Sequence, residues 1–510
     1  MRTNILQYLE ETVRRCPDKA AFSDGEHTLT FLKLYDRACR IGSALSHKGV
    51  RGKPVMVLMD KTPEAIAAFF GIIYAGGFYV ALDVKTPAQR ARMIFDTVGA
   101  AHMVCSDNHL KTAEALHFSG EVMTDSALAG EPVDGQALSE VRNGQLDIDP
   151  IYVVFTSGST GVPKGVVACH RSVIDYTEAL CEAVPFDADT VFGNQTPLYF
   201  DAPLKEIMPT IKYGATTYLI PQRNFLFPVK LCEFLNTHRI NTICWVVSAL
   251  TMISSLGALD KNPPKYLRLV CFGSEVFPRP QYNLWREAMP HVAFFNLYGP
   301  TEATGMSCWW HADRALAPDE PIPVGRPFRN TDILLLAEGT HGARRITPDE
   351  PDTEGEICMR GTCVTLGYYN DPARTAVAFV QNPLQSAYPE IIYRTGDIGR
   401  YNAHGELVFV GRRDAQIKIL GHRVELGEIE AAAAPAVRAA CCVYDGARTR
   451  LVLYYTADES VTPDGLRAML NQRLPRYMMP ALLIRLDALP LTPNGKIDRR
   501  TLTEAAKATD

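Results

Sequence analysis

The sequence predicts an α/β protein whose sheets are mainly parallel and covered by helices, followed by a smaller C-terminal α+β domain. Short apolar runs alternate with helical patterns through most of the chain, as is typical of parallel strands joined by helices. Three of these runs are 54–59, 151–155 and 267–272. The pattern changes at a charged turn after Gly411, so we expect a large domain over residues 1–410 and a small one over 411–510.

One uncharged run, 65–82, is long enough to be tested as a membrane-spanning helix. Thr62 and Pro63 are typical of the beginning of a helix, and the glycines at 76–77 are typical of its end. The following residues 78–80 are β-forming. We therefore expect a buried helix and then a buried strand, not a membrane span.

The C-terminal domain has its own sequence of expected elements. A strand over 416–420 is followed by a helix from about Glu425, and two further strands are expected near 441–444 and 451–455. This mixture of short strands and helices is typical of a small α+β domain.

Composition excludes several classes of protein. Among 510 residues, 47% are hydrophobic and 21% are charged, which is ordinary for a globular protein and excludes a disordered one. With 52 basic and 57 acidic residues the net charge is -5, so we expect neither nucleic acid nor an anionic membrane as a partner. The 13 cysteines include no C-x-x-C pair, and the N-terminus has no signal-peptide pattern, so we expect a reduced, cytoplasmic protein.

The segment 155–165 directly follows an apolar strand and is rich in Gly, Ser and Thr. Backbone N–H groups freed by glycine, together with hydroxyls and a lysine, favour a phosphate-binding loop over a simple turn. It is not a Walker A loop, because Lys164 is followed by Gly165 where Ser or Thr would be required. The candidate phosphate ligands are Thr156, Ser157, Gly158, Ser159, Thr160 and Lys164.

This loop resembles a motif of the adenylate-forming superfamily, which contains acyl-CoA synthetases, luciferases and the amino-acid adenylation domains of nonribosomal peptide synthesis. Further segments resemble the family's motifs in the family's order: 75–80, 296–302, 355–357, 367–368, 393–397, 411–430 and 491–498. The resemblance covers essentially the whole chain. It implies a large nucleotide-binding body, a small mobile C-terminal domain, and the use of ATP and Mg²⁺.

The resemblance also implies roles for residues in these motifs. Tyr298 would stack on adenine, Asn296 would bind its edge, and Glu302 would hold Mg²⁺. Asp397 would accept the ribose hydroxyls, with Arg412 and Phe409 beside the nucleotide. The implied nucleotide-binding set therefore adds Asn296, Leu297, Tyr298, Gly299, Pro300, Thr301, Asp397, Phe409 and Arg412 to the loop residues. Taken singly, these residues are also compatible with packed turns, helix starts or surface charges.

Three residues of the small domain have implied roles in catalysis. Lys496 resembles the family's catalytic lysine, a cation that would stabilise the charge developing at the α-phosphate. Asp414 resembles the hinge residue about which the small domain turns, and Gly421 resembles the glycine that lines the tunnel for the incoming thiol.

The substrate depends on the segment 199–206. Asp201 stands where amino-acid-activating relatives bind the substrate α-ammonium, and an unpaired buried carboxylate would reject acids that lack the amine. The alternative is that Asp201 caps the helix that begins near Pro203.

By motif register, the side-chain pocket contains Ala202, Lys205, Val246, Val270, Phe272, Leu297, Gly305 and Met306. Its mostly apolar walls imply a modest side chain. Lys205 would pair with an acidic substrate if it points inward, or reach solvent if it points outward.

In length and layout the chain most resembles free-standing D-alanine–carrier protein ligases and other stand-alone adenylation enzymes. It has Gly273 where those ligases have a cysteine, so D-alanine is one candidate substrate among several. Residues 497–510 are too few for a carrier domain, and we expect a separate phosphopantetheine carrier protein as the acceptor. Two alternatives stay open: an acyl- or aryl-CoA ligase, and a nucleotide-binding regulatory protein without turnover.

Overall fold

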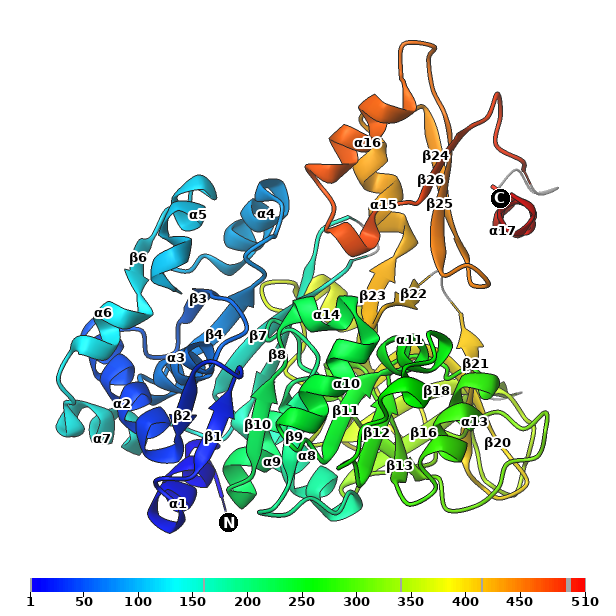
Figure 1. The fold of residues 1–510 in the computed structure, drawn as a ribbon. Helices are drawn as coiled ribbons and strands as arrows, with labels where there is room; N and C mark the ends of the chain where they lie inside the picture. Colours follow the sequence, from blue (N-terminus) through cyan, green and yellow to red (C-terminus); the bar gives the residue numbers. More distant parts are fainter. Residues whose placement is uncertain (1, 159–160, 340–341, 414–415, 492–496, 510) are drawn as a thin grey trace.

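The computed structural model describes residues 2–158, 161–339, 342–413, 416–491 and 497–509 (Figure 1). It has the expected α/β fold: a broad N-terminal body of three sheets and a smaller C-terminal lobe that stands on it (Figure 1). Ser159, Thr160, Asp414 and Lys496, for which the sequence predicts functional roles, lie outside the described residues.

The first sheet has nine strands in the order β15-β14-β13-β12-β11-β9-β10-β1-β2. Its strands are β1 (Ala20–Ser23), β2 (Thr28–Thr30), β9 (Val191–Asn194), β10 (Thr216–Leu219), β11 (Thr242–Val246), β12 (Leu269–Gly273), β13 (Ala293–Tyr298), β14 (Cys308–His311) and β15 (Arg326–Pro327). The run from β13 through β12, β11, β9 and β10 to β1 is parallel. Every residue of β11 and β12 is buried, as continuous apolar strands covered on both faces require.

The second sheet has six strands in the order β6-β5-β3-β4-β7-β8, and all its pairings are parallel except that of β7 with β8. Its strands are β3 (Pro54–Leu58), β4 (Phe78–Leu82), β5 (His102–Cys105), β6 (Glu121–Thr124), β7 (Pro150–Thr156) and β8 (Lys164–Cys169). The candidate phosphate loop therefore connects two antiparallel strands, β7 and β8.

The uncharged run 65–82 is a helix followed by a strand, as the sequence predicts. Helix α3 (Pro63–Tyr74) begins after Thr62, whose side chain accepts a hydrogen bond from the backbone of Ala65, and β4 follows at Phe78. Within the described ranges, no helix is both long and apolar enough to cross a membrane.

Helices pack on both parallel sheets. The remaining helices of the body are α1 (Leu6–Arg15), α2 (Phe31–His47), α4 (Ala88–Val98), α5 (Leu110–Ala115), α6 (Asp125–Gly130), α7 (Gly135–Asn143), α8 (His170–Ala183), α9 (Leu204–Tyr213), α10 (Pro228–Thr237), α11 (Val247–Ser255), α12 (Ala258–Lys261), α13 (Arg279–Ala288) and α14 (Pro372–Ala378), with 3-10 turns at Asp107–His109, Gln222–Leu226 and Thr301–Ala303.

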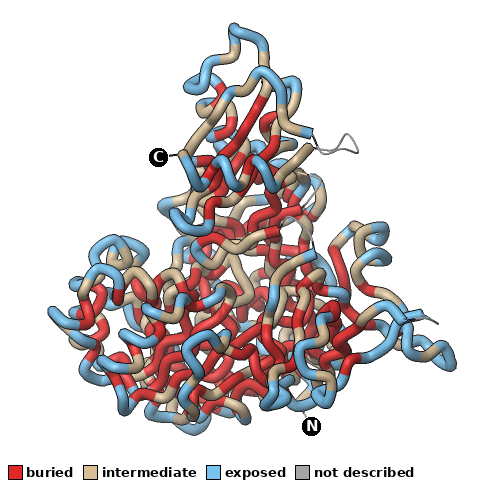
Figure 2. The backbone as a smooth tube through the Cα atoms, turned by 90° about the vertical axis from the view of Figure 1, so that its right-hand side faces the viewer, coloured by how far each residue is buried: buried red, intermediate tan, exposed pale blue. Residues whose placement is uncertain are grey.

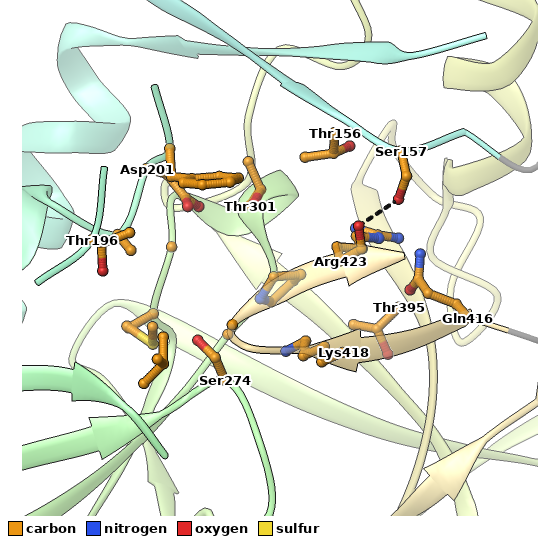
Figure 3. Close-up of a pocket in the computed structure, with 18 of the residues that line it drawn as sticks. Thr156, Ser157, Thr196, Asp201, Ser274, Thr301, Thr395, Gln416, Lys418 and Arg423 are labelled. Atoms are coloured by element: carbon orange, nitrogen blue, oxygen red, sulfur yellow. Dashed lines mark hydrogen bonds between the residues drawn. The ribbon is translucent and has the colours of Figure 1, made fainter. Parts of the chain in front are cut away.

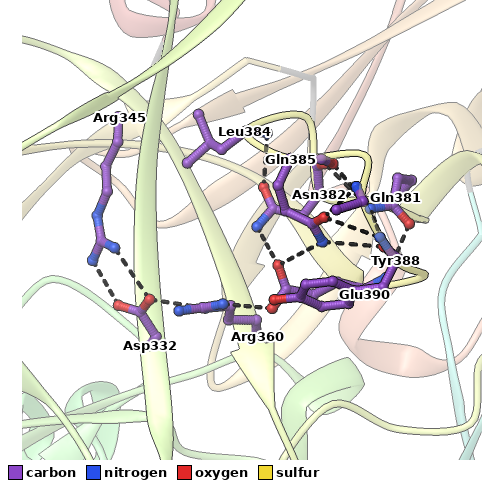
Figure 4. A network of polar contacts seen from close by, with 10 residues as sticks. Asp332, Arg345, Arg360, Gln381, Asn382, Leu384, Gln385, Tyr388 and Glu390 are labelled. Carbon is purple, nitrogen blue, oxygen red and sulfur yellow. Dashed lines mark hydrogen bonds and ion pairs between the residues drawn. The ribbon is translucent and has the colours of Figure 1, made fainter.

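The third sheet is antiparallel, which the prediction of mainly parallel sheets in the large domain did not include. Its strands are β16 (Thr331–Gly339), β17 (Gly342–Ile346), β18 (Gly355–Gly361), β19 (Phe379–Gln381), β20 (Ile391–Tyr401) and β21 (Leu407–Arg412). On its surface, Asp332 accepts hydrogen bonds from Arg345 at 2.6 Å and Arg360 at 2.9 Å, and Arg360 also reaches Glu390 (Figure 4). These ion pairs connect β16, β17 and β18 to the segment that precedes β20.

The C-terminal lobe contains the four elements expected from the sequence, β22 (Gln416–Ile419), α15 (Leu426–Ala433), β24 (Ala439–Asp445) and β25 (Arg450–Thr456), and further ones that were not expected. Strands β22 and β23 (His422–Glu425) form a hairpin that is followed by α15, and β24, β25 and β26 (Leu482–Arg485) form a sheet. The lobe also contains α16 (Pro463–Asn471), a 3-10 turn (Arg476–Met478) and α17 (Arg499–Ala508). It has buried residues that form a core of its own (Figure 2), and α15 and α16 lie against β24–β26 (Figure 1).

Helices α2 and α3 approach each other closely at Gly71. A Cβ atom at this position would lie 2.6 Å from Cγ2 of Ile41 and 3.1 Å from the carbonyl oxygen of Ala38. Such distances require one of the two buried helices to move.

We predict that Gly71→Ala lowers the free energy of unfolding by about 1–3 kcal/mol, because the added methyl group overpacks this contact. Chemical denaturation measures the change. Gly130→Ala is the matched control, since a Cβ there meets nothing within 4 Å, and it is expected to change stability by less than about 1 kcal/mol. Equal effects of the two substitutions would contradict the packing argument.

Candidate active site

A pocket opens between the body and the β22–β23 hairpin of the small lobe (Figure 3). It is lined by the ends of strands from all three sheets of the body. Of the residues with a predicted role, those that line it are Thr156, Ser157, Asp201, Ala202, Val246, Gly299, Pro300, Thr301, Gly305, Met306, Asp397, Arg412 and Gly421. The fold thus collects residues that are up to 265 positions apart, from Thr156 to Gly421, around one cavity.

Other residues for which the sequence predicts a binding role are not among those that line the pocket. Val270, Phe272 and Leu297 are buried in the cores of the body, and Asn296 donates a hydrogen bond to the carbonyl oxygen of Pro323 at 2.7 Å. Phe409 packs in the same apolar cluster as Tyr298. Val270, Phe272 and Leu297 pack on other core residues and are not among the residues that line this pocket, so their roles in binding the substrate side chain stay predictions.

One corner of the pocket is built around Asp397 on β20. Its carboxylate accepts a hydrogen bond from the Tyr298 hydroxyl and forms an ion pair with Arg412, which stands opposite it on β21. The backbone N–H of Asp397 donates to the Thr395 hydroxyl at 2.9 Å. These contacts fix a charged acceptor at the pocket wall.

A second cluster surrounds Glu302, which is fully buried after β13. Arg423 of the hairpin lies 2.9 Å from both carboxylate oxygens, the Tyr368 hydroxyl donates at 2.8 Å, and the Lys164 ammonium lies 3.2 Å from Oε1. Burial alone would raise the pKa of Glu302, but the charges of Arg423 and Lys164 outweigh burial and hold this pKa well below its usual range. Glu302 is therefore an ionised carboxylate.

The donor chemistry at Glu302 fits Mg²⁺ as a single protein ligand. Mg²⁺ commonly takes one or two carboxylates and completes its coordination with phosphate oxygens and water. Within the described ranges there is no group of three or more His, Cys, Asp or Glu that would form an all-protein metal site. Arg423 engages both oxygens of Glu302 in this structure, so a bound Mg²⁺ would either share the carboxylate with this guanidinium or replace it.

The donors of the candidate phosphate loop face the small lobe. The Ser157 hydroxyl donates to the carbonyl oxygen of Arg423 at 2.8 Å, and the backbone N–H of Gly158 donates to Glu428 Oε2 at 3.1 Å. Glu428, on α15, also forms an ion pair with Arg90 of α4. Burial raises the pKa of Glu428, and the charge of Arg90 opposes this shift.

Asp201 lies just before α9 and faces the pocket next to Thr301 (Figure 3). The cap residue of α9 is Pro203, with no side-chain cap hydrogen bond, so the alternative that Asp201 caps this helix is wrong. Burial raises the pKa of Asp201, while the Thr301 hydroxyl and the ammonium of Lys205 oppose the shift. A cationic group in the pocket would favour the ionised form.

Lys205 and Glu206 lie on the buried side of α9, next to the pocket but not among its lining residues. Lys205 is 3% exposed, so it does not reach solvent, and Glu206 is completely buried. The Glu206 carboxylate lies among the side chains of Lys205, Asn194 and Lys61. Burial raises the pKa of Glu206 to about 8, although the charges of Lys205 and Lys61 oppose this shift.

The pocket contains three residues of the hairpin for which we did not predict roles. Gln416 and Lys418 alternate along β22, and Arg423 pairs directly with Lys418 across the hairpin. All three lie in the segment 411–430, which resembles a family motif. The sequence could have identified them, because residues two apart, such as Gln416 and Lys418, face the same side of a strand. A hairpin with its turn at 420–421 then places Arg423 opposite Lys418.

Comparisons with known proteins identify the family. Residues 9–369 match the model of the AMP-binding enzyme family, and the chain therefore belongs to this family. It is 34% identical over 97% of its length to the phosphinothricin tripeptide synthetase PhsC of Streptomyces viridochromogenes, and 29% identical over 98% of its length to tyrocidine synthase 1 of Brevibacillus parabrevis. The chain spans less than half of each of these relatives, 44% of the first and 45% of the second.

Two solved structures show the same fold. One is PA1221, a nonribosomal peptide synthetase protein with adenylation and PCP domains bound to a vinylsulfonamide inhibitor, with a TM-score of 0.80 and 25% identity over 98% of this chain and 84% of that chain. The other is the Vibrio cholerae adenylation domain AlmE in complex with glycyl-adenosine-5'-phosphate, with a TM-score of 0.85 and 21% identity over 100% of this chain and 98% of that chain.

We predict that Glu206 makes the protein less stable as the pH rises. The folded protein holds this proton until about pH 8, whereas an ordinary glutamate loses it near pH 4.5, so folding is favoured at the lower pH. Relative to Glu206→Gln, the wild-type protein should lose roughly 2–4 kcal/mol of unfolding free energy between pH 5 and pH 8. Denaturant titrations of both proteins at each pH measure this difference, and parallel pH profiles would contradict the prediction.

Proposed function

We propose that this protein uses ATP to activate an amino acid as aminoacyl-AMP and transfers the aminoacyl group to the phosphopantetheine thiol of a separate carrier protein. The observation that carries the proposal is the position of Asp201 in the same pocket as Asp397 and Arg412. The Asp201 carboxylate is suited to a substrate ammonium, and the Asp397 carboxylate is suited to ribose hydroxyls. The match to AMP-binding enzymes supports the nucleotide chemistry.

In the first half-reaction, the substrate carboxylate attacks the α-phosphate of ATP and pyrophosphate leaves. Asp201 binds the α-ammonium and so orients the attacking carboxylate. Asp397 receives the ribose hydroxyls beside Tyr298, and Lys164 and the loop bind the phosphates. Mg²⁺ at Glu302 would neutralise phosphate charge. Lys496 is proposed as the cation at the α-phosphate, and Asp414 as the hinge about which a small domain, predicted over 411–510, moves on a body predicted over 1–410. We assign Arg412 to the body, because β21 of the third sheet extends to this residue.

In the second half-reaction, a thiol attacks the acyl carbon of the adenylate, the thioester forms and AMP leaves. Gly421 is proposed to line the thiol's path. A Cβ atom there would lie 2.5 Å from Val246 Cγ1, and its φ of +79° favours glycine, so any side chain would obstruct the pocket wall. The backbone N–H of Gly421 donates to Glu275 at 2.8 Å, which holds the hairpin in place.

D-alanine stays one candidate substrate, but the cysteine of the D-alanine ligases has no room at Gly273 on this backbone. A Cβ atom at Gly273 would lie 2.1 Å from the carbonyl oxygen of Leu297, so a cysteine there would require the strands to move. The pocket of the D-alanine ligases therefore cannot be copied by one substitution. The alternative function is the activation of an acid without an amine and its transfer to coenzyme A. Such a substrate would offer Asp201 no ammonium group to bind.

We predict that the purified protein catalyses ATP–pyrophosphate exchange with one amino acid, or a narrow set, among D- and L-amino acids and β-alanine. Asp201→Asn should lower kcat/KM for that amino acid at least about 100-fold, because the ammonium loses its counter-charge. Aryl and short fatty acids serve as the matched substrates without an amine. If only these acids support exchange, and Asp201→Asn does not change it, the CoA-ligase alternative would replace the amino-acid proposal. If the protein binds ATP but shows no exchange with any acid, a nucleotide-binding regulatory protein would be favoured.

We predict further that, if the preferred amino acid is acidic, Lys205→Met selectively abolishes its exchange, because the buried ammonium is the available counter-charge. Methionine retains much of the packing volume. Lys230→Met, on the exposed face of α10, is the control. An exchange profile that is the same in Lys205→Met and wild type would show that Lys205 does not select the substrate.

A further inference from the structure

Glu275 forms two hydrogen bonds, one within the body and one to the hairpin of the small lobe. It lies in the segment after β12, and its Oε2 accepts the backbone N–H of Ser248 at 2.8 Å. Its Oε1 accepts the backbone N–H of Gly421 at 2.8 Å. One carboxylate therefore joins the first turn of α11 to the turn between β22 and β23.

The two groups that Glu275 binds belong to neighbouring walls of the pocket. Ser248 is the second residue of α11, and Val246 is the cap residue of this helix. Val246 and Gly421 both line the pocket, and a Cβ atom at Gly421 would lie 2.5 Å from Val246 Cγ1 and 3.1 Å from its Cβ. The two bonds of Glu275 thus hold Val246 and Gly421 at a fixed separation.

Helix α11 favours a carboxylate at this place. The first N–H groups of a helix have no partner within the helix, and its N-terminus carries a partial positive charge. The cap residue of α11 is a valine, which makes no side-chain cap hydrogen bond. Glu275 provides both the acceptor and the negative charge, so its carboxylate has a fixed orientation in the body.

The backbone is strained on both sides of the bond between Glu275 and Gly421. Ser274, just before Glu275, has a φ of +69°, and Leu420, just before Gly421, has a φ of +51°. Residues other than glycine rarely adopt this left-handed conformation. Ser274 also lines the pocket, near the hairpin in Figure 3. Such strain persists only where the surrounding structure holds it, and it gathers at functional sites.

We propose that Glu275 is a positioning residue for the second half-reaction: by binding Gly421 and the beginning of α11 together, it fixes the width of the passage for the thiol. This inference rests on the proposed function, in which Gly421 lines the thiol's path. Glu275 is not among the described residues that line the pocket, so it acts through Gly421 and Val246 and not by contact with a substrate.

The two bonds differ in what they require of the small lobe. The bond to Ser248 joins two segments of the body, so it does not depend on the small lobe. The bond to Gly421 forms only while the hairpin lies over the pocket, because Gly421 belongs to the small lobe. Loss of the second bond should therefore affect the reaction that uses the passage beside Gly421, which is thiol transfer, and not the activation of the amino acid.

The test measures the two half-reactions separately in the chain of 510 residues, with the amino acid that it activates. ATP–pyrophosphate exchange measures the first, and mass spectrometry of aminoacyl-pantetheine measures the second, with free pantetheine as the thiol. Glu275→Ala should lower kcat/KM for pantetheine about 10-fold or more and leave exchange within about twofold of wild type, because a displaced wall misaligns the thiol.

Glu275→Gln is the conservative variant. Its side chain has the same size but only one acceptor atom, so one of the two N–H groups would face the amide NH₂. Its kcat/KM for pantetheine should lie between those of wild type and Glu275→Ala, again with normal exchange. This variant decides the question even if Glu275→Ala does not fold.

Glu287→Ala is the matched control, because it removes an exposed carboxylate from α13 of the body. It should leave both half-reactions unchanged. An equal loss of pantetheine transfer in this control would mean that the net charge, and not the two bonds of Glu275, causes the effect, and it would overturn the proposal.

A purely structural role of Glu275 predicts a different pattern. If Glu275 only capped α11, Glu275→Ala and Glu275→Gln would lower both half-reactions together, and that result would overturn the proposal. Normal pantetheine transfer in both variants would contradict the proposal alone. A wild-type protein without exchange, or with exchange but without aminoacyl-pantetheine, would contradict the proposed function and this inference with it.

Discussion

The buried carboxylate of Glu302 is the interaction on which the arrangement of the site depends. It lies in the turn after β13, and its partners come from β8, from the segment after β18 and from the hairpin of the small lobe. A buried charge is stable only when it is paired, so this one residue requires the three parts of the chain to meet. Arg423 is the partner that the small lobe contributes, so this ion pair is one of the contacts that hold the lobe over the pocket.

The body supplies rigid positions, and the hairpin supplies most of the additional charge. Asp397 and Arg412 are fixed by register across β20 and β21, and Asp201 is fixed by the segment that enters α9. Lys418 and Arg423, in contrast, reach the pocket only through docking of the hairpin. A site divided in this way can change its charge when the small lobe moves, without any rearrangement of the body.

The sequence was sufficient for the elements whose local pattern is unambiguous. The helix and strand at 65–82, the loop after β7 and four elements of the small lobe (β22, α15, β24 and β25) lie where the sequence pattern predicted them, whereas β23, α16, β26 and α17 were not predicted. The antiparallel third sheet was not foreseen, because alternating apolar runs do not distinguish parallel from antiparallel pairing when the partners are far apart in sequence. The motif register did not say which side of the sheet Phe272 and Leu297 face, because adjacent strand residues face opposite sides, and the structure packs these two residues in different cores.

By itself, then, the amino-acid sequence determined the fold class, the order of the elements and the residue types that nucleotide chemistry requires, because these follow from local periodicity and motif composition. Only the tertiary structure decided that Lys205 is buried beside Glu206, that Gly273 has no room for a side chain, and that Glu428 and Arg423 occupy the loop and Glu302. These facts depend on contacts between segments that are distant in the chain, and the electrostatic cost of burying each charge is set by those contacts alone.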